Sequence, residues 1–229
     1  QRSATCVREA ATAGAPAVAA SRTNVAVSWI STDAGAIRMR WSSDRGYSWY
    51  AANAVGTGAV SGSSASIAMV AERIVIGWTT PTGYAVRIRD FRWGYRPWPG
   101  TVYWHQTAII GPSADAERTY ERVGLGQVAA NGWGRTAVAF EACWAGCGPS
   151  DPPSSYRADI LWRESWDNGG RWSRSQVVIP DPAAAGGHAS ASLPSALWPT
   201  STSRYLLATR RGAAEAPDDV WMVTGTGRP

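Results

Sequence analysis

The sequence predicts an all-β fold, a small β-propeller of about four blades of antiparallel strands. Three observations predict it: the residue composition, many short strand-like runs, and an internal repeat. The 229 residues include 14 Trp, 8 Tyr, 24 Gly and 14 Pro, and short runs of Val, Ile and Ala end at turn residues. Long amphipathic helices are hard to find. By length alone, one closed all-β domain and two small domains are equally compatible with the chain.

The internal repeat is the strongest of these observations. Residues 24–29 recur at residues 73–78, an offset of 49 residues, and the same offset places Trp49 on Trp98. Two further copies follow, each with three short runs that alternate like strands. The runs of the third copy are 127–130, 136–140 and 158–163, and those of the fourth are 193–197, 204–208 and 219–223. Repeats of about 40 to 60 residues with three or four strands each are typical of propeller blades.

We expect a single domain over residues 1–229, whose last blade takes a strand from the N-terminus. The sequence ends where the fourth strand of that blade should start, and residues 4–9 could supply this strand. An unpaired strand edge there would favour aggregation. An incomplete ring that closes only by oligomerisation is the alternative. The expected blades are 14–62, 63–123, 124–187, and 188–229 completed by 1–13.

One motif, Ser-x-Asp-x-Gly-x-x-Trp, follows the third run of two repeat copies without a mismatch. Its residues are Ser42, Asp44, Gly46 and Trp49 in the first copy and Ser165, Asp167, Gly169 and Trp172 in the third. In the second copy, residues 91–98 keep only the final Trp of the motif in register, and the fourth copy lacks it.

The motif resembles the Asp-box, or BNR repeat, of sialidases and related β-propellers. The resemblance is specific for the repeat and says nothing of a substrate. It implies that Asp44 and Asp167 have a structural role and no catalytic one. In such a turn the Asp accepts backbone N–H groups, the Gly adopts a positive φ, and the Trp packs between neighbouring blades.

The resemblance also implies which face of the propeller could bind a ligand. Asp-boxes join the third and fourth strands of a blade and mark one face, and in sialidases the opposite face contains the active site. The longest irregular segments fall on that opposite face, as expected of a binding surface. These segments are roughly 105–121, 141–156, 181–191 and 210–218.

Aromatic and Arg residues of these segments are the candidate binding residues, because aromatic rings stack on sugars and Arg pairs with carboxylates. The candidates for ligand or partner contacts are Trp144, Tyr120, Arg118, Arg122, Arg210 and Arg211. The alternative is that they are ordinary loop residues, with Trp144 covering a disulfide.

The three cysteines favour an oxidising compartment. Cys143 and Cys147 lie four residues apart, where a local disulfide could close, and Cys6 is left over. The sequence begins at Gln1, as in a secreted protein whose signal peptide has been removed, although a trimmed chain would look the same. We therefore expect a secreted, extracellular protein without a membrane span.

Charge and histidine content limit the remaining functions. The net charge is +5, and all 22 basic residues are Arg; biased composition explains this, and so would affinity for acidic sugars. His105 and His188 are far apart in the sequence, so no metal site is expected, and no cofactor motif is present. Charge alone favours nucleic acid, but no recognised module supports it, so no nucleic-acid partner is expected.

The functional prediction is a secreted non-catalytic module that binds a glycan or a protein partner. Sialidases typically have a Phe/Tyr-Arg-Ile-Pro motif, which this sequence lacks, and they bring a Tyr and a Glu together from distant blades, unlike the adjacent Tyr120 and Glu121. One alternative is a structural subunit of an extracellular assembly, such as a filament, surface layer or homo-oligomer. The other alternative is a sialidase-like glycoside hydrolase.

Overall fold

The computed structural model describes eleven segments of the chain, and every regular element in them is a β-strand. The described residues are 16–31, 35–70, 73–90, 106–111, 118–131, 135–148, 157–167, 169–179, 190–197, 204–211 and 219–225. In this part of the chain no helix is long and apolar enough to cross a membrane. The predicted N-terminal strand, the decayed motif at 91–98, Cys6, His105 and His188 lie outside the described residues.

The strands form four antiparallel sheets in which neighbours in the sequence are neighbours in the sheet. The first sheet contains β1 (Ala17–Ser21), β2 (Asn24–Ser31), β3 (Ala36–Ser42) and β4 (Asn53–Gly56), and the second contains β5 (Ser66–Val70), β6 (Arg73–Thr80), β7 (Gly83–Asp90) and β8 (Ala108–Ile110). The third contains β9 (Arg122–Ala130), β10 (Thr136–Ala145), β11 (Arg157–Ser165) and β12 (Gln176–Ile179), and the fourth contains β13 (Ser190–Leu197), β14 (Arg204–Arg211) and β15 (Asp219–Gly225).

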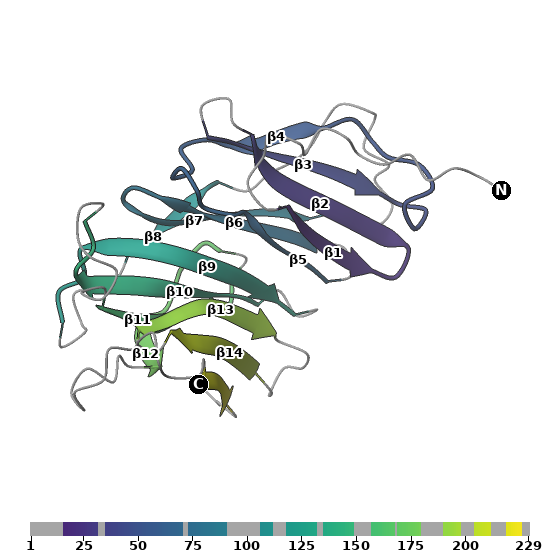
Figure 1. Cartoon of the computed structure of the whole chain (residues 1–229). Coiled ribbons are helices and arrows are strands. Elements are labelled where there is room, and N and C mark those ends of the chain that lie inside the picture. Colours follow the sequence, from purple (N-terminus) through teal and green to yellow (C-terminus); the bar gives the residue numbers. More distant parts are fainter. Residues whose placement is uncertain are drawn as a thin grey trace.

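The sheets follow one another like propeller blades, with the first strand of each sheet on the inside. Strand β1 packs beside β5, β5 beside β9, and β9 beside β13. Figure 1 shows the four sheets as a row, with the first and the fourth at opposite ends, so the described strands do not close a ring. The all-β propeller architecture predicted from the repeat is confirmed. Closure of the last blade by residues 1–13 stays a prediction, because those residues are not described.

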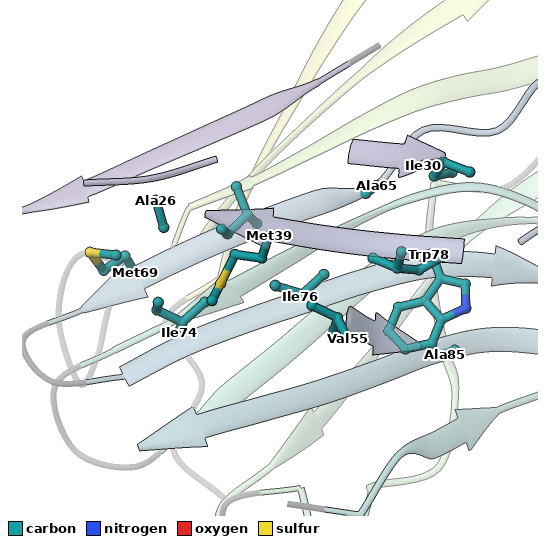
Figure 2. Close-up of a cluster of buried hydrophobic side chains, with 12 residues drawn as sticks. Ala26, Ile30, Met39, Val55, Ala65, Met69, Ile74, Ile76, Trp78 and Ala85 are labelled. Atoms are coloured by element: carbon teal, nitrogen blue, oxygen red, sulfur yellow. The ribbon is translucent and has the colours of Figure 1, made fainter. Parts of the chain in front are cut away.

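The first core lies between the first two sheets and follows from the alternation of their strands. Ile37 and Met39 of β3 face Ile74 and Ile76 of β6, as Figure 2 shows for the last three, and all four are fully buried. Side chains two residues apart in a strand share a face, so every second residue enters this core. Burying each of these side chains stabilises the fold by roughly 1.5–3 kcal/mol.

The second core joins the second and third sheets around Tyr84 of β7. The Tyr84 ring is fully buried, and its hydroxyl forms a 2.8 Å hydrogen bond with the Ser66 hydroxyl, which also accepts the Val128 N–H at 3.0 Å. The ring fits because both flanking positions lack a side chain. A Cβ on Gly77 would lie 2.5 Å from Tyr84 Cε1, and a Cβ on Gly126 would lie 2.4 Å from its Cε2. Gly77 of the second sheet and Gly126 of the third thus form a slot for the Tyr84 ring, which packs the two sheets together.

The turn after β3 is organised by hydrogen bonds of Ser42 and Asp44. Asp44 Oδ1 accepts the Ser42 hydroxyl at 2.7 Å and the Ser48 N–H at 2.8 Å, while Ser42 Oγ accepts the Gly46 N–H at 2.8 Å. Gly46 has a φ of 86°, which favours glycine. The turn thus satisfies its backbone donors locally.

The turn after β11 repeats this arrangement. Asp167 Oδ1 accepts the Ser165 hydroxyl at 2.9 Å and the Arg171 N–H at 2.7 Å, and Gly169 has a φ of 85°. Both turns join the third and fourth strands of their sheets, so they lie on one face of the propeller, which we call the Asp-turn face.

Asp44→Asn is expected to make stability less dependent on pH between about 4 and 2. Hydrogen bonds from the Ser48 hydroxyl, the Ser48 N–H and the Ser42 hydroxyl lower the Asp44 pKa from 3.8 to about 2. A lowered folded-state pKa means that the carboxylate stabilises the fold above pH 3.8, and that this contribution is lost as the pH falls through about 2. Thermal melts at pH 6, 4, 3 and 2 measure it. Glu121→Gln, which removes another exposed carboxylate, is the control; equal pH profiles for the wild type and Asp44→Asn would contradict the prediction.

Candidate functional site

The candidate site lies on the face opposite the Asp-turn face. In an antiparallel sheet, alternate connections emerge at opposite ends of the strands. The β4–β5, β8–β9 and β10–β11 connections therefore share the end away from the two Asp turns. We call this side the loop face.

A buried carboxylate, Asp159, is the centre of the site. Asp159 lies near the start of β11, opposite Ala142 of β10, and its side chain is only 2% exposed. The Tyr120 hydroxyl donates a hydrogen bond to Asp159 Oδ2 at 2.8 Å. The Arg118 guanidinium pairs with Oδ1 at 2.9 Å and is 33% exposed. Two residues of the segment before β9 are thereby fixed to the third sheet through one carboxylate.

Trp144 adds an aromatic ring to this group. The Arg118 Cζ lies 4.7 Å from the centroid of the Trp144 ring, a cation–π distance. Trp144 lies at the end of β10, where a disulfide joins Cys143 to Cys147, and both cysteines are buried. We call Arg118, Tyr120, Trp144 and Asp159 the Asp159 cluster. In it a cation, a phenol, an indole and a carboxylate meet at the loop face.

A backbone hydrogen bond fixes the segment before β9 against β10. The Glu121 N–H donates to the Cys143 carbonyl at 2.8 Å, directly beside the disulfide. Tyr120, the preceding residue, packs against the core of the second and third sheets. The position of Tyr120 therefore depends on both backbone and side-chain contacts, which suits a group that must hold a defined geometry.

The surroundings keep the Tyr120 hydroxyl protonated. Burial raises the Tyr120 pKa above its usual value of 10.0, and the hydrogen bond to Asp159 and the charge of Asp159 raise it further, while Arg118 acts in the opposite direction. At neutral pH Tyr120 is therefore a neutral phenol that donates a hydrogen bond to Asp159 Oδ2. Such a pair can transfer the phenolic proton to the carboxylate when the phenolic oxygen forms a new bond.

The structure brings together three of the six predicted binding residues and leaves three outside the Asp159 cluster. Arg118, Tyr120 and Trp144 meet at Asp159. Arg122 is exposed at the start of β9, opposite Cys143. The backbones of Arg210 and Arg211 lie in β14, but their side chains are outside the described part of the chain.

Asp159 is the residue that the sequence prediction missed. It stands within the run Ala158-Asp159-Ile160-Leu161-Trp162, where a charged residue interrupts a buried strand. A carboxylate at such a place needs partners, and this was the available signal. Among the described residues, no group of three or more His, Cys, Asp and Glu side chains converges in a way that could hold a metal ion.

No protein-family model matches the chain, and no curated protein matches it. Several solved structures are similar in fold. The α-L-arabinofuranosidase of Fusarium graminearum is 14% identical with a TM-score of 0.45, the alignment covering 86% of this chain and 59% of that chain. An α-L-arabinanase of Penicillium chrysogenum is 13% identical with a TM-score of 0.46, covering 95% and 67%. The catalytic domain of a Coprinopsis cinerea α-L-arabinofuranosidase is 12% identical with a TM-score of 0.39, covering 97% and 93%.

These findings correct the prediction of a non-catalytic module for binding or interaction, because the similar structures are glycoside hydrolases. The prediction depends on a missing Phe/Tyr-Arg-Ile-Pro motif, and the absence of one family's motif does not exclude another catalytic arrangement on the same fold. The likeness is one of fold. The chain spans about three-fifths of the length of the Fusarium enzyme.

Proposed function

We propose that the chain is a sialidase-like glycoside hydrolase that acts on glycosides of acidic sugars, with Tyr120 as the nucleophile and Asp159 as its base. The observation that supports the proposal is the 2.8 Å hydrogen bond from the Tyr120 hydroxyl to a carboxylate that is 2% exposed. A phenol is a weak nucleophile by itself, and an adjacent base activates it. Among glycoside hydrolases, sialidases use a Tyr nucleophile.

The first step forms a bond between Tyr120 Oη and the anomeric carbon of the sugar. As this bond forms, the phenolic proton passes to Asp159, and the bond between the anomeric carbon and the leaving-group oxygen breaks. Water then attacks the anomeric carbon and loses one proton to the Glu121 carboxylate or to solvent, the bond from that carbon to Tyr120 Oη breaks, and Asp159 returns its proton to the Tyr120 oxygen. Glu121, which is exposed and adjacent in sequence, is a candidate donor of the proton that a poor leaving group needs.

Charge favours an acidic substrate. A neutral phenol meets no repulsion from a carboxylate beside the anomeric carbon, whereas a carboxylate nucleophile would. Arg122 is exposed at the start of β9, at the end of the third sheet where Asp159 lies, and the chain has a net charge of +5. Arg forms bidentate contacts with carboxylates, so these groups suit a sugar acid.

Secretion and membership of the Asp-box family belong to the same proposal. The disulfide between Cys143 and Cys147 supports an oxidising compartment. The hydrogen bonds of Asp44 and Asp167 inside their turns support a structural role for the two motifs. The catalytic residues then lie on the loop face.

The test is a panel of 4-methylumbelliferyl glycosides that includes a sialoside, a glucuronide and an α-L-arabinofuranoside. The aryl leaving group needs little protonation, so hydrolysis reports on the nucleophile. We expect turnover of an acidic glycoside and a loss of about 10²-fold or more in Asp159→Asn, which keeps the shape of the side chain but removes the base. Thermal melts of the variant show whether it is folded. No turnover of any acidic glycoside by the folded wild type would contradict the proposal.

A further inference from the structure

A second group of aromatic residues lies on the Asp-turn face, away from the Asp159 cluster. Trp41 is the second-to-last residue of strand β3, and Tyr50 follows the Asp44 turn. Their rings are stacked, with centroids 4.1 Å apart and planes inclined by 14°. The Tyr50 N–H donates to the Trp41 carbonyl at 3.0 Å, so the backbone also holds the pair together.

One face of the Tyr50 ring is available to solvent. Tyr50 is 46% exposed although Trp41 covers one of its faces, so the exposed area belongs to the other face and the edge. The neighbouring turn is polar: the Ser43 hydroxyl lies 3.4 Å from the Tyr50 hydroxyl, and Tyr47, which is 81% exposed, lies between them in the sequence. The surface combines a flat ring with hydroxyl groups.

The stacked pair has a rigid support. The Arg89 Cζ lies 5.3 Å from the centroid of the Trp41 ring, and Arg89 is only 4% exposed. Burial lowers the Arg89 pKa to about 10, so the group is still a cation at neutral pH. Arg89 of the second sheet thereby fixes the Trp41 ring, and the Trp41 ring in turn supports the Tyr50 ring. A ring that is already ordered loses little entropy when a ligand stacks on it.

A sugar ring fits this surface better than a protein partner does. A stable protein interface buries about 800 Å² on each partner, and Ser residues are depleted in such interfaces. Here the exposed aromatic side chains of residues 43–50 are only two, Tyr47 and Tyr50, and the exposed Ser43, Arg45 and Ser48 belong to the same short segment. Aromatic rings with one apolar face and a polar edge match a sugar, which has an apolar C–H face and hydroxyls at its edge.

We propose that Tyr50, stacked on Trp41, is a carbohydrate-binding platform for one sugar ring of a polysaccharide chain, on the face opposite the Asp159 cluster. The platform is independent of the proposed hydrolysis. It would hold the protein on a long glycan while the loop face remains accessible. Because an uncharged sugar ring can stack on Tyr50 as well as an acidic one, the platform does not require an acidic sugar.

The test is native affinity electrophoresis in gels that contain galactan, arabinan, xylan or a soluble β-glucan. Neutral polymers are used because a protein with a net charge of +5 would be retarded by an anionic polymer through charge alone. We expect at least one polymer to retard the wild type, and Tyr50→Ala to weaken this binding about tenfold. Tyr50→Phe, which keeps the stack, should bind like the wild type.

Trp166→Ala is the matched control, since Trp166 is 52% exposed beside the other Asp turn. Hydrolysis of an aryl glycoside, where it is found, should be unchanged in Tyr50→Ala. Thermal melts show whether the variants are folded. The proposal is overturned if none of the four polymers retards the wild type, or if the wild type and folded Tyr50→Ala are retarded equally. Either result counts whether or not the chain hydrolyses glycosides. Equal loss in Trp166→Ala and Tyr50→Ala would also overturn it.

Discussion

Tyr120→Phe is expected to lower kcat for an activated aryl glycoside by about 10³-fold or more. The variant keeps the ring, which packs against the core of the second and third sheets, and removes only the oxygen that would form the bond to the sugar. The variant also removes a hydrogen bond to the buried Asp159 side chain, which costs about 1.5–3 kcal/mol of folding free energy. For a domain of this size that lowers the melting temperature by roughly 3–12 °C.

The control for this experiment is Tyr47→Phe, which removes a phenolic oxygen that is 81% exposed on the Asp-turn face. Steady-state kinetics and thermal melts of both variants separate catalysis from stability. A nucleophile role requires that Tyr120→Phe is inactive but folded, and that the covalent adduct found by mass spectrometry with a fluorinated inhibitor maps to Tyr120. Wild-type kcat in Tyr120→Phe would show that Tyr120 is a structural residue.

Gly126→Ala has the largest expected effect on stability. The added Cβ would lie 2.4 Å from Tyr84 Cε2, and the ring cannot retreat because a Cβ-less residue, Gly77, already touches its other side. Overpacking of a filled core costs roughly 1–3 kcal/mol and sometimes more. Since the Tyr84 hydroxyl would also move away from Ser66, we expect the upper end, about 3 kcal/mol, or a fall of about 10 °C in melting temperature.

Gly111→Ala is the matched control, because its Cβ would meet only the Thr82 carbonyl at 4.0 Å. Differential scanning calorimetry of the two variants gives the comparison. Similar melting temperatures for both would mean that Tyr84 can leave the slot without cost, and the described packing of the second sheet on the third would then be wrong.

The repeat predicts the fold well because its periodicity is a local property of the sequence. Residues 24–29 and 73–78 lie within β2 and β6, the equivalent second strands of their sheets. Alternation places Ile74 and Ile76 on one face of β6, and the core forms there. The same approach does not find the Tyr84 slot, because Gly126 comes from another sheet and nothing near Tyr84 in the sequence indicates it.

The candidate site could be predicted only in part. Tyr120 and Trp144 lie in or beside long connections, which the sequence shows, whereas Asp159 lies in a strand that otherwise looks like core. The hydrogen bonds from Arg118 and Tyr120 to Asp159 span about forty residues of sequence, and residue spacing does not reveal contacts of that range. The prediction of a non-catalytic module is wrong for the same reason. It depends on the absence of one family's sequence motif, and a motif does not show which distant side chains meet in the folded chain.

Because of the two-glycine slot around Tyr84, the blades of this chain are not interchangeable. By strand register, Tyr84, which pairs with Thr79 of β6, corresponds to Ile37, which pairs with Ile30 of β2. Gly77 corresponds to Ser28, at an offset of 49 residues. The first sheet therefore has neither the ring nor the slot, and a copy of it could not replace the second sheet without opening a hole beside the third. Recombination of blades, by gene duplication or by protein engineering, should succeed when the second and third blades are moved together and fail when the cut passes between them.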